Sequence, residues 1–195
     1  MPENTVQFGI SKCYVATLTK DESGTVTYGV PKALPGAVSI KGKAEGSNDK
    51  FYADNIVYYM SRKNSGYTYD LELANLPDWF RQTYMANKLS TDKLNVESDD
   101  PNFTPFALLF EFEGDVKAKR HICYNCYATR PDEEAKTIED KKDPNTITIG
   151  IECVPLVVND VALIKAHTTA DTDSTKYANF FTAAPALPSF DTTAG

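Results

Sequence analysis

Apolar and polar residues alternate along most of this chain, which predicts a protein built mainly of β-strands. The clearest run is Tyr67–Leu73, where tyrosine and leucine take every second position and threonine, aspartate and glutamate stand between them. The same period of two recurs in Ala37–Glu45, Phe106–Glu113 and Thr146–Val154. Such spacing is typical of a sheet with one buried and one polar face.

Apolar-rich runs and turn residues extend this pattern. Further strands are predicted over Gly9–Leu18, Thr25–Val30, Phe51–Met60, Val116–Thr129 and Val157–Ala166. The polar, glycine-containing stretch Gly46–Lys50 is the expected turn of a hairpin formed by its two flanking strands. Another hairpin is expected about Gly114–Asp115, with Glu111 and Glu113 facing lysines and Arg120 on the returning strand.

One segment, residues 76–89, predicts a helix. Pro77 and Asp78 at its start and Lys88 near its end match the residue preferences of helix termini. A narrow apolar stripe recurs at helical spacing and would lie on a sheet: Leu76, Phe80 and Tyr84. The expected fold class is therefore mainly β, a β-sandwich of two packed sheets with one flanking α-helix.

We expect a single β-sandwich domain over residues 1–166 and a C-terminal extension over residues 167–195. From His167 onward the composition shifts to threonine, alanine, aspartate and serine without periodicity, and the last ten residues are expected to be flexible. The length of 195 residues suits one domain with a substantial core.

The charge and the apolar runs restrict the class of function. The formal net charge is −7 and the acidic residues are spread along the chain, which argues against nucleic-acid binding through clustered Lys and Arg. The polar N-terminal residues do not resemble a signal peptide, and the longest apolar runs, such as Phe106–Phe110, are too short to span a bilayer. We expect a soluble protein made in the cytoplasm, with no membrane partner and with reduced cysteines.

Candidate chemistry is sparse. Cys123 and Cys126 form a Cys-x-x-Cys pair, which can be half of a zinc site or a redox pair, but on a continuous strand the two side chains would point to opposite faces. The two histidines, His121 and His167, accompany no nucleophile or phosphate-binding motif. Acidic residues at 97–100 and 171–173 lack the spacing of a calcium loop. We expect no enzymatic activity, no cofactor and no metal.

Several segments, taken in order, resemble the major tail protein family of siphophages, the long-tailed phages, that infect Gram-positive bacteria. They cover most of the chain as far as about residue 184: Tyr28–Val38, Lys50–Asn55, Ser65–Ala74, Pro77–Phe80, Phe106–Phe112, His121–Pro131 and Tyr177–Phe181. Each segment alone is only weakly specific for this family, but their number and order together make the resemblance specific.

The resemblance implies a structural virion protein of the tail tube, made in the host bacterial cytoplasm. Subunits of this family form hexameric rings that stack into a tube, and strands from six neighbours close an inner β-barrel. The implied partners are the tape-measure protein in the lumen, the tail terminator and distal tail proteins at the ends, and DNA in transient passage. An acidic wall suits such a conduit, because it repels phosphate.

Two sets of residues follow as candidate sites. The first is an inter-subunit hairpin whose apolar residues need a neighbour to cover them; it comprises Glu45, Lys50, Phe51, Tyr52, Asp54, Asn55 and Tyr58. The second is acidic and would line the lumen: Asp70, Glu72 and Glu152. Two other functions stay open, a capsid decoration protein and a carbohydrate-binding module that would use Tyr58, Tyr59 and Tyr67.

Overall fold

The computed structural model describes residues 4–131 and 145–190, which form a mainly β protein with two short helices. The first strands are β1 (Gln7–Lys20), β2 (Val26–Tyr28), β3 (Lys32–Ala33), β4 (Ala37–Ala53) and β5 (Ile56–Leu73). After helix α1 (Asp78–Tyr84) come β6 (Lys88–Leu89), β7 (Asn95–Val96), β8 (Phe106–Gly114) and β9 (Lys119–Ala128). The chain continues through β10 (Ile147–Cys153), β11 (Leu156–Val158), β12 (Val161–Leu163), β13 (Lys165–His167) and helix α2 (Ser174–Ala178).

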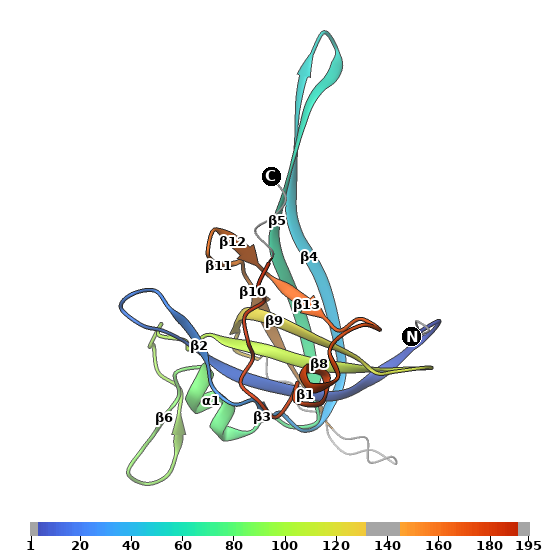
Figure 1. Ribbon diagram of the computed structural model, residues 1–195. Coiled ribbons are helices and arrows are strands. Elements are labelled where there is room, and N and C mark those ends of the chain that lie inside the picture. Colours follow the sequence, from blue (N-terminus) through green and yellow to red (C-terminus); the bar gives the residue numbers. More distant parts are fainter. Residues whose placement is uncertain (1–3, 132–144, 191–195) are drawn as a thin grey trace, which may run out of the picture.

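Nine of these strands form one large antiparallel sheet (Figure 1). Its order is β2-β1-β8-β9-β10-β5-β4, with β3 added beside β1 and β13 beside β9. The prediction of a mainly β protein is confirmed. The strands do not divide clearly into two packed sheets, because β10 joins β9 to β5 and makes the sheet continuous. The sheet instead turns back on itself, so that β1 lies against β4 without pairing with it.

The main core lies inside this turn of the sheet. It is built from the apolar positions that alternation predicted, including Leu71, Leu73, Ile149 and Ile151, all fully buried. The alternating residues of β8 also point into it: Phe106, Leu108 and Phe110. The residues of β8 between them are buried on the opposite face, so this strand is covered on both sides.

Helix α1 closes one side of the core, but it is shorter than predicted. It ends at Tyr84, and the prediction that the helix reaches residue 89 is wrong. The helix ends because Ala86 takes a positive φ of 57° and redirects the chain, after which Lys88 belongs to β6 and pairs with β7. Phe80 and Tyr84 are buried, so the predicted apolar stripe is confirmed over the two turns that exist.

The C-terminal segment covers the outer face of β1, β8 and β9. His167 ends β13, which pairs with β9, and the next residue, Thr168, is buried. Phe181, three residues beyond α2, is buried in a second apolar cluster with Leu109, Ile122 and Tyr124. The extension from residue 167 thus packs on the sheet as far as this phenylalanine. Residues 191–195, half of the segment expected to be flexible, lie outside the described residues, as does most of the charged connection before β10.

A buried carboxylate joins three strands. Glu111 is 4 % exposed and contacts Lys12 Nζ at 3.0 Å and Arg120 Nε at 2.7 Å. The predicted pairing of Glu111 with Arg120 across β8 and β9 is confirmed. Burial acts to raise the pKa of Glu111, but the hydrogen bonds from Arg120 and Lys12 outweigh it and hold that pKa below its usual value.

Stability is expected to fall as the solution is acidified, first through His121. This ring stacks on Phe110 with centroids 5.0 Å apart, and burial, aided by His167 and Lys119, lowers its pKa to about 4. An unfolded histidine titrates near pH 6.5. Between these two values the unfolded chain binds a proton that the folded chain does not, so folding weakens as the pH falls. The stability that Glu111 adds is lost at still lower pH, below about 4.3, because its folded pKa is depressed.

Urea unfolding from about pH 7 to about pH 4.5 should therefore show a loss of about 2 kcal/mol, after allowance for partial exposure of the ring. His121→Gln should remove most of this loss. An unfolding free energy that stays constant over this range would contradict the assignment.

No helix in residues 4–131 and 145–190 is both long and apolar enough to cross a bilayer.

Candidate assembly surface

The longest hairpin in the described part of the chain, formed by β4 and β5, projects far beyond the body of the sheet (Figure 1). Its inner half is part of the large sheet, because β5 pairs with β10 from Leu73 as far as Tyr67. Beyond that point, among residues 4–131 and 145–190, β4 and β5 pair only with each other, from Glu45 opposite Gly66 out to Ala53 opposite Ile56. We call residues 45–66 the projecting hairpin.

The turn of this hairpin is not where the sequence predicted it. Gly46–Lys50 belongs to β4, and the chain reverses at Asp54–Asn55. Both turn residues have positive φ, 53° and 61°, as a two-residue type I′ turn requires, and Asp and Asn tolerate this conformation better than most residues. The predicted turn was wrong because Gly46 is required for close packing of the two paired strands and does not form a turn. A Cβ at that position would lie 2.3 Å from the carbonyl oxygen of Lys63 on the opposite strand.

Gly66 marks the point where the projecting hairpin leaves the body. Its φ is +126°, and a Cβ there would lie 2.0 Å from the carbonyl oxygen of Cys153 on β10. Only glycine allows β5 to pass β10 this closely while changing direction.

Gly66→Ala is therefore expected to destabilise the fold by about 2–4 kcal/mol, because the new methyl group meets backbone and the backbone angle is unfavourable. Gly9→Ala is the matched control, since nothing lies within 4 Å of a Cβ built there. Urea unfolding of both variants measures the difference. Equal stability of the two would show that the junction is not constrained.

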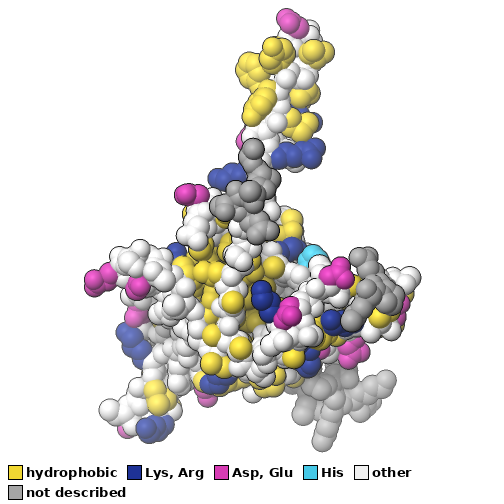
Figure 2. Space-filling view, viewed as in Figure 1, with side chains coloured by type: hydrophobic (Ala, Val, Ile, Leu, Met, Phe, Trp, Pro, Cys, Tyr) yellow, Lys and Arg dark blue, Asp and Glu magenta, His cyan; other side chains and the backbone are white. Residues whose placement is uncertain are grey.

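Large apolar side chains crowd the outer end of the projecting hairpin and are exposed (Figure 2). Tyr58 is 72 % exposed, Tyr59 63 % and Phe51 61 %. The full set is Phe51, Tyr52, Ile56, Val57, Tyr58, Tyr59 and Met60. Seven such residues within ten positions of a segment without a core are unusual for a protein that exists alone.

Both faces of the projecting hairpin carry these side chains. Phe51 and Tyr59 lie directly opposite each other and share one face. Tyr52 and Val57 form the next pair outward, beyond a bulge that adds one residue to β5. Tyr52 directly follows Phe51 on β4, so alternation places this pair on the other face. A two-stranded ribbon of this kind is at best marginally stable in water when nothing covers it.

The predicted hairpin residues all lie on the projecting hairpin. Phe51, Tyr52 and Tyr58 belong to the exposed apolar set, and Asp54 and Asn55 form the turn. Glu45 lies at the inner end, where it pairs with Lys43 at 3.1 Å, and Lys50 is exposed opposite Met60. The apolar residues that the site prediction missed are Ile56, Val57, Tyr59 and Met60; the turn placed too early concealed that both strands contribute.

The three predicted acidic residues share one face of the sheet, the face opposite the main core. Thr148 lies opposite Glu72, Gly150 opposite Asp70, and Glu152 opposite Thr68, which puts all three carboxylates on the same side of β5 and β10. Asp70 and Glu152 are exposed. Hydrogen bonds from Thr146 and Ser39, at 2.7 and 2.8 Å, lower the pKa of Glu72. We call these three residues the acidic face; Lys41 and Lys43 on β4 adjoin it.

The tyrosines considered for carbohydrate binding do not form one surface. Tyr58 and Tyr59 are near the end of the projecting hairpin, whereas Tyr67 lies at its base, stacked on Tyr69 with ring centroids 5.9 Å apart. At the rise of an extended strand, Tyr58 and Tyr67 are separated by roughly 30 Å.

The prediction that Cys123 and Cys126 point to opposite faces is wrong, because a bulge lies between them. Phe106 lies opposite Cys126 but Leu108 lies opposite Cys123, so β9 has one more residue than β8 in this interval. The bulge turns Cys123 and Cys126 to the same face, where Cys153 joins them; the three sulfur atoms lie within 4.8 Å of one another. Among residues 4–131 and 145–190 this is the one group whose arrangement would allow it to hold a metal ion.

The other candidate ligands have different partners. Glu97 pairs with Arg130 at 2.9 Å, Asp100 pairs with Lys88 at 3.1 Å, and Asp173 caps α2 through the backbone N–H of Lys176. The two histidines lie side by side, with ring centroids 5.6 Å apart. Neither calcium candidate gathers its carboxylates around one point.

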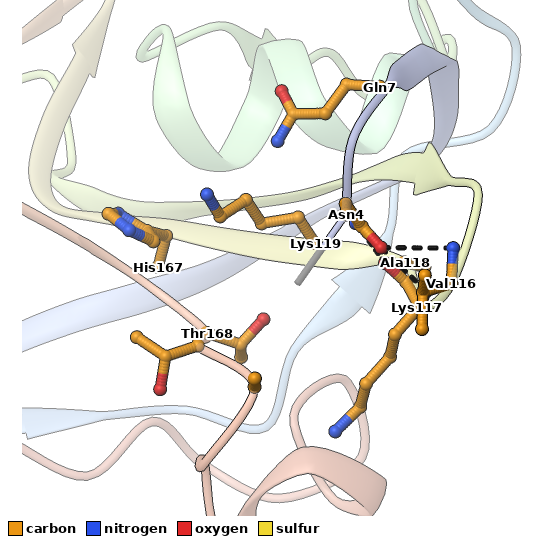
Figure 3. Close-up of a pocket in the computed structure, with 10 residues that line it drawn as sticks. Asn4, Gln7, Val116, Lys117, Ala118, Lys119, His167 and Thr168 are labelled. Atoms are coloured by element: carbon orange, nitrogen blue, oxygen red, sulfur yellow. Dashed lines mark hydrogen bonds between the residues drawn. The ribbon is translucent and has the colours of Figure 1, made fainter. Parts of the chain in front are cut away.

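A pocket of about 330 Å³ lies beside the β8–β9 turn (Figure 3). Asn4 makes three hydrogen bonds at this pocket. The Asn4 side chain accepts hydrogen bonds from the backbone N–H groups of Val116 and Lys117 and donates one to the carbonyl oxygen of Lys117. Lys119 and His167 also line the pocket. These bonds attach the N-terminal segment to the turn, which is a structural role.

Neither the protein-family models nor the curated proteins with which this sequence was compared include a match.

Proposed function

We propose that this chain is a structural subunit of a phage tail tube that assembles by covering the projecting hairpin with neighbouring copies. The observation that supports this most directly is the set of exposed apolar side chains on both faces of a ribbon that extends away from its own core. Burial of one such side chain contributes about 1.5–3 kcal/mol. Seven of them are enough to drive association.

The open edges of the sheet support a second copy as the partner. β4 ends the sheet, and over its 17 residues the described part of the chain pairs it on one side only, with β5. A long unpaired edge is a template for another strand, and closing several sheets into a ring removes every such edge. In this proposal the edge of β4 adjoins the sheet of the next subunit, and the projecting hairpin reaches across its surface.

The resemblance to siphophage major tail proteins supplies the rest of the proposal. The resemblance implies hexameric rings that stack into a tube; in this proposal the continuous sheet, turned back on itself, takes the place of the two packed sheets expected of that family. The acidic face lies on β5 and β10, next to β4. In this proposal these strands line the lumen, where the carboxylates repel DNA phosphates. The tape-measure protein would occupy the lumen before DNA passes, and terminator and distal tail proteins would close the ends.

Sedimentation velocity of the full chain over a range of concentrations tests this proposal. We expect monomer at low concentration and rings or longer polymers as the concentration rises. A monomer at every concentration would contradict the proposal and favour a binding module, whereas a discrete trimer would favour a decoration protein.

A further inference from the structure

We infer that Cys126 and Cys153 form an oxidisable pair that can link β9 to β10 by a disulfide bond. The two residues lie directly opposite each other on adjacent antiparallel strands, and their sulfur atoms are 2.7 Å apart. This modification site is independent of the proposed assembly.

The backbone geometry suits a bond at this position. The N–H of Val154 donates to the carbonyl oxygen of Asn125, and the N–H of Thr129 donates to the carbonyl oxygen of Gly150. Asn125 and Val154 are therefore a hydrogen-bonded pair. Because such pairs alternate along an antiparallel ladder, the next pair, Cys126 and Cys153, is a non-hydrogen-bonded one. In such pairs the Cα atoms are about 4.5 Å apart, within the range that a disulfide spans.

The surroundings favour a disulfide over a metal site. Cys126 and Cys153 are 0 % and 2 % exposed, in a cluster of aromatic and aliphatic side chains. A tetrahedral zinc site needs a fourth ligand, and in the described residues the group holds three cysteines only. Three thiolates around a zinc ion would also leave a net negative charge in an apolar core, which is costly. A disulfide needs two sulfurs and buries no charge.

Burial also explains why the pair can persist as thiols. It raises the pKa of Cys126, so the reactive thiolate is scarce while the core is closed. The pairing of β9 with β10 is short, however, from Ile151–Cys153 to Cys126–Ala128. Local opening of so short a ladder needs less free energy than global unfolding and would expose the pair to an oxidant.

Hydrogen peroxide is the oxidant that we name. The thiolate of Cys126 attacks one peroxide oxygen and the O–O bond breaks, which gives a sulfenic acid and a hydroxide that takes up the proton lost by the Cys126 thiol to form water. The sulfur of Cys153 then attacks the sulfenic sulfur, and the hydroxyl leaves as a second water with the remaining thiol proton. The two thiols lose two electrons, which reduce one peroxide to two waters.

Cys123 carries the third sulfur of the group, and its substitution is the most stringent control. Its backbone carbonyl oxygen is 3.7 Å from Cys126 Sγ, and its own sulfur lies 3.6 Å from the hydroxyl of Tyr69. Because it lies across a bulge on the same strand as Cys126, it does not face Cys153 in register. Cys123→Ala should therefore leave the disulfide intact.

The test is peptide mapping of the full-length protein after hydrogen peroxide treatment, with free thiols alkylated under denaturing conditions. We expect two free thiols, at Cys13 and Cys123, and one linked peptide pair joining Cys126 to Cys153. The oxidised protein should melt about 5–10 °C above the reduced protein. Cys153→Ala should abolish this difference without lowering the melting temperature of the reduced form to the same extent.

Three results would overturn the inference. They are four free thiols after treatment that fully oxidises the unfolded chain, a bond that joins Cys123 to Cys126, and stoichiometric zinc in the purified protein with all three thiols protected until a chelator is added. The mapping of the unaltered protein needs no variant to fold.

Discussion

Replacing Gly46–Ser65 by an Asn-Gly turn that joins Glu45 to Gly66 is expected to give a folded protein that stays monomeric at every concentration. The deletion removes the part of the hairpin that pairs with no other strand, and it keeps the register of β4, β5 and β10 in the body. The removed segment contributes nothing to either buried cluster, so the unfolding free energy should change by about 1 kcal/mol or less.

A triple substitution separates the apolar side chains from the length of the hairpin. Phe51→Ser, Tyr58→Ser and Tyr59→Ser keep both strands but remove much of the exposed apolar surface. If neighbouring copies bury these rings, the concentration needed for assembly should rise by at least about 100-fold, because each factor of ten corresponds to 1.4 kcal/mol. Val157→Ser is the control, since Val157 is also exposed but lies on β11, outside the projecting hairpin.

Sedimentation velocity measures both sets of variants, with circular dichroism to confirm folding. Unfolding of the shortened protein would show that the projecting hairpin stabilises its own subunit. Assembly of the shortened protein at the wild-type concentration would remove the hairpin from the interface.

The second large effect is expected from reversing the charge of the acidic face. Asp70→Lys with Glu152→Lys should make assembled tubes retain DNA, because the proposed hexameric ring would repeat each position six times and lysine binds phosphate strongly. Glu72 is left unchanged, since its bonds to Ser39 and Thr146 join β4, β5 and the segment before β10. The control, Glu22→Lys with Asp92→Lys, changes the net charge equally at exposed positions elsewhere.

Protection from nuclease decides where the DNA is bound. Tubes assembled in the presence of short double-stranded DNA are treated with DNase, and surviving DNA is measured. The reversed acidic face should protect DNA, with at least about tenfold less protection as salt rises from 50 to 200 mM. The control tubes should bind DNA on the outside and leave it digestible. Equal digestion in both would place Asp70 and Glu152 on the outer wall.

Period-two patterns predicted the inner part of the sheet well, because burial of one face requires an apolar residue at every second position of the strand. Leu71, Leu73, Ile149 and Ile151 are core residues for this reason, and the carboxylates between them share a face. The apolar stripe of α1 was also predictable, since Phe80 and Tyr84 must reach the sheet.

The errors arose where a non-local contact decided the local structure. Gly46 resembled a turn residue, but its small size is needed for the close approach of Lys63 on the paired strand. The one extra residue opposite β8 turned Cys123 and Cys126 to the same face, and the position of a bulge depends on the partner strand. The continuity of the sheet through β10 likewise depends on long-range pairing that no local pattern records.

Electron microscopy of the purified full chain at high concentration tests the central claim most directly. The account predicts stacked rings or tubes with sixfold symmetry, in which density for residues 45–66 of each subunit lies against a neighbour. Isolated particles of single-subunit size at all concentrations, with the same hairpin uncovered, would contradict it.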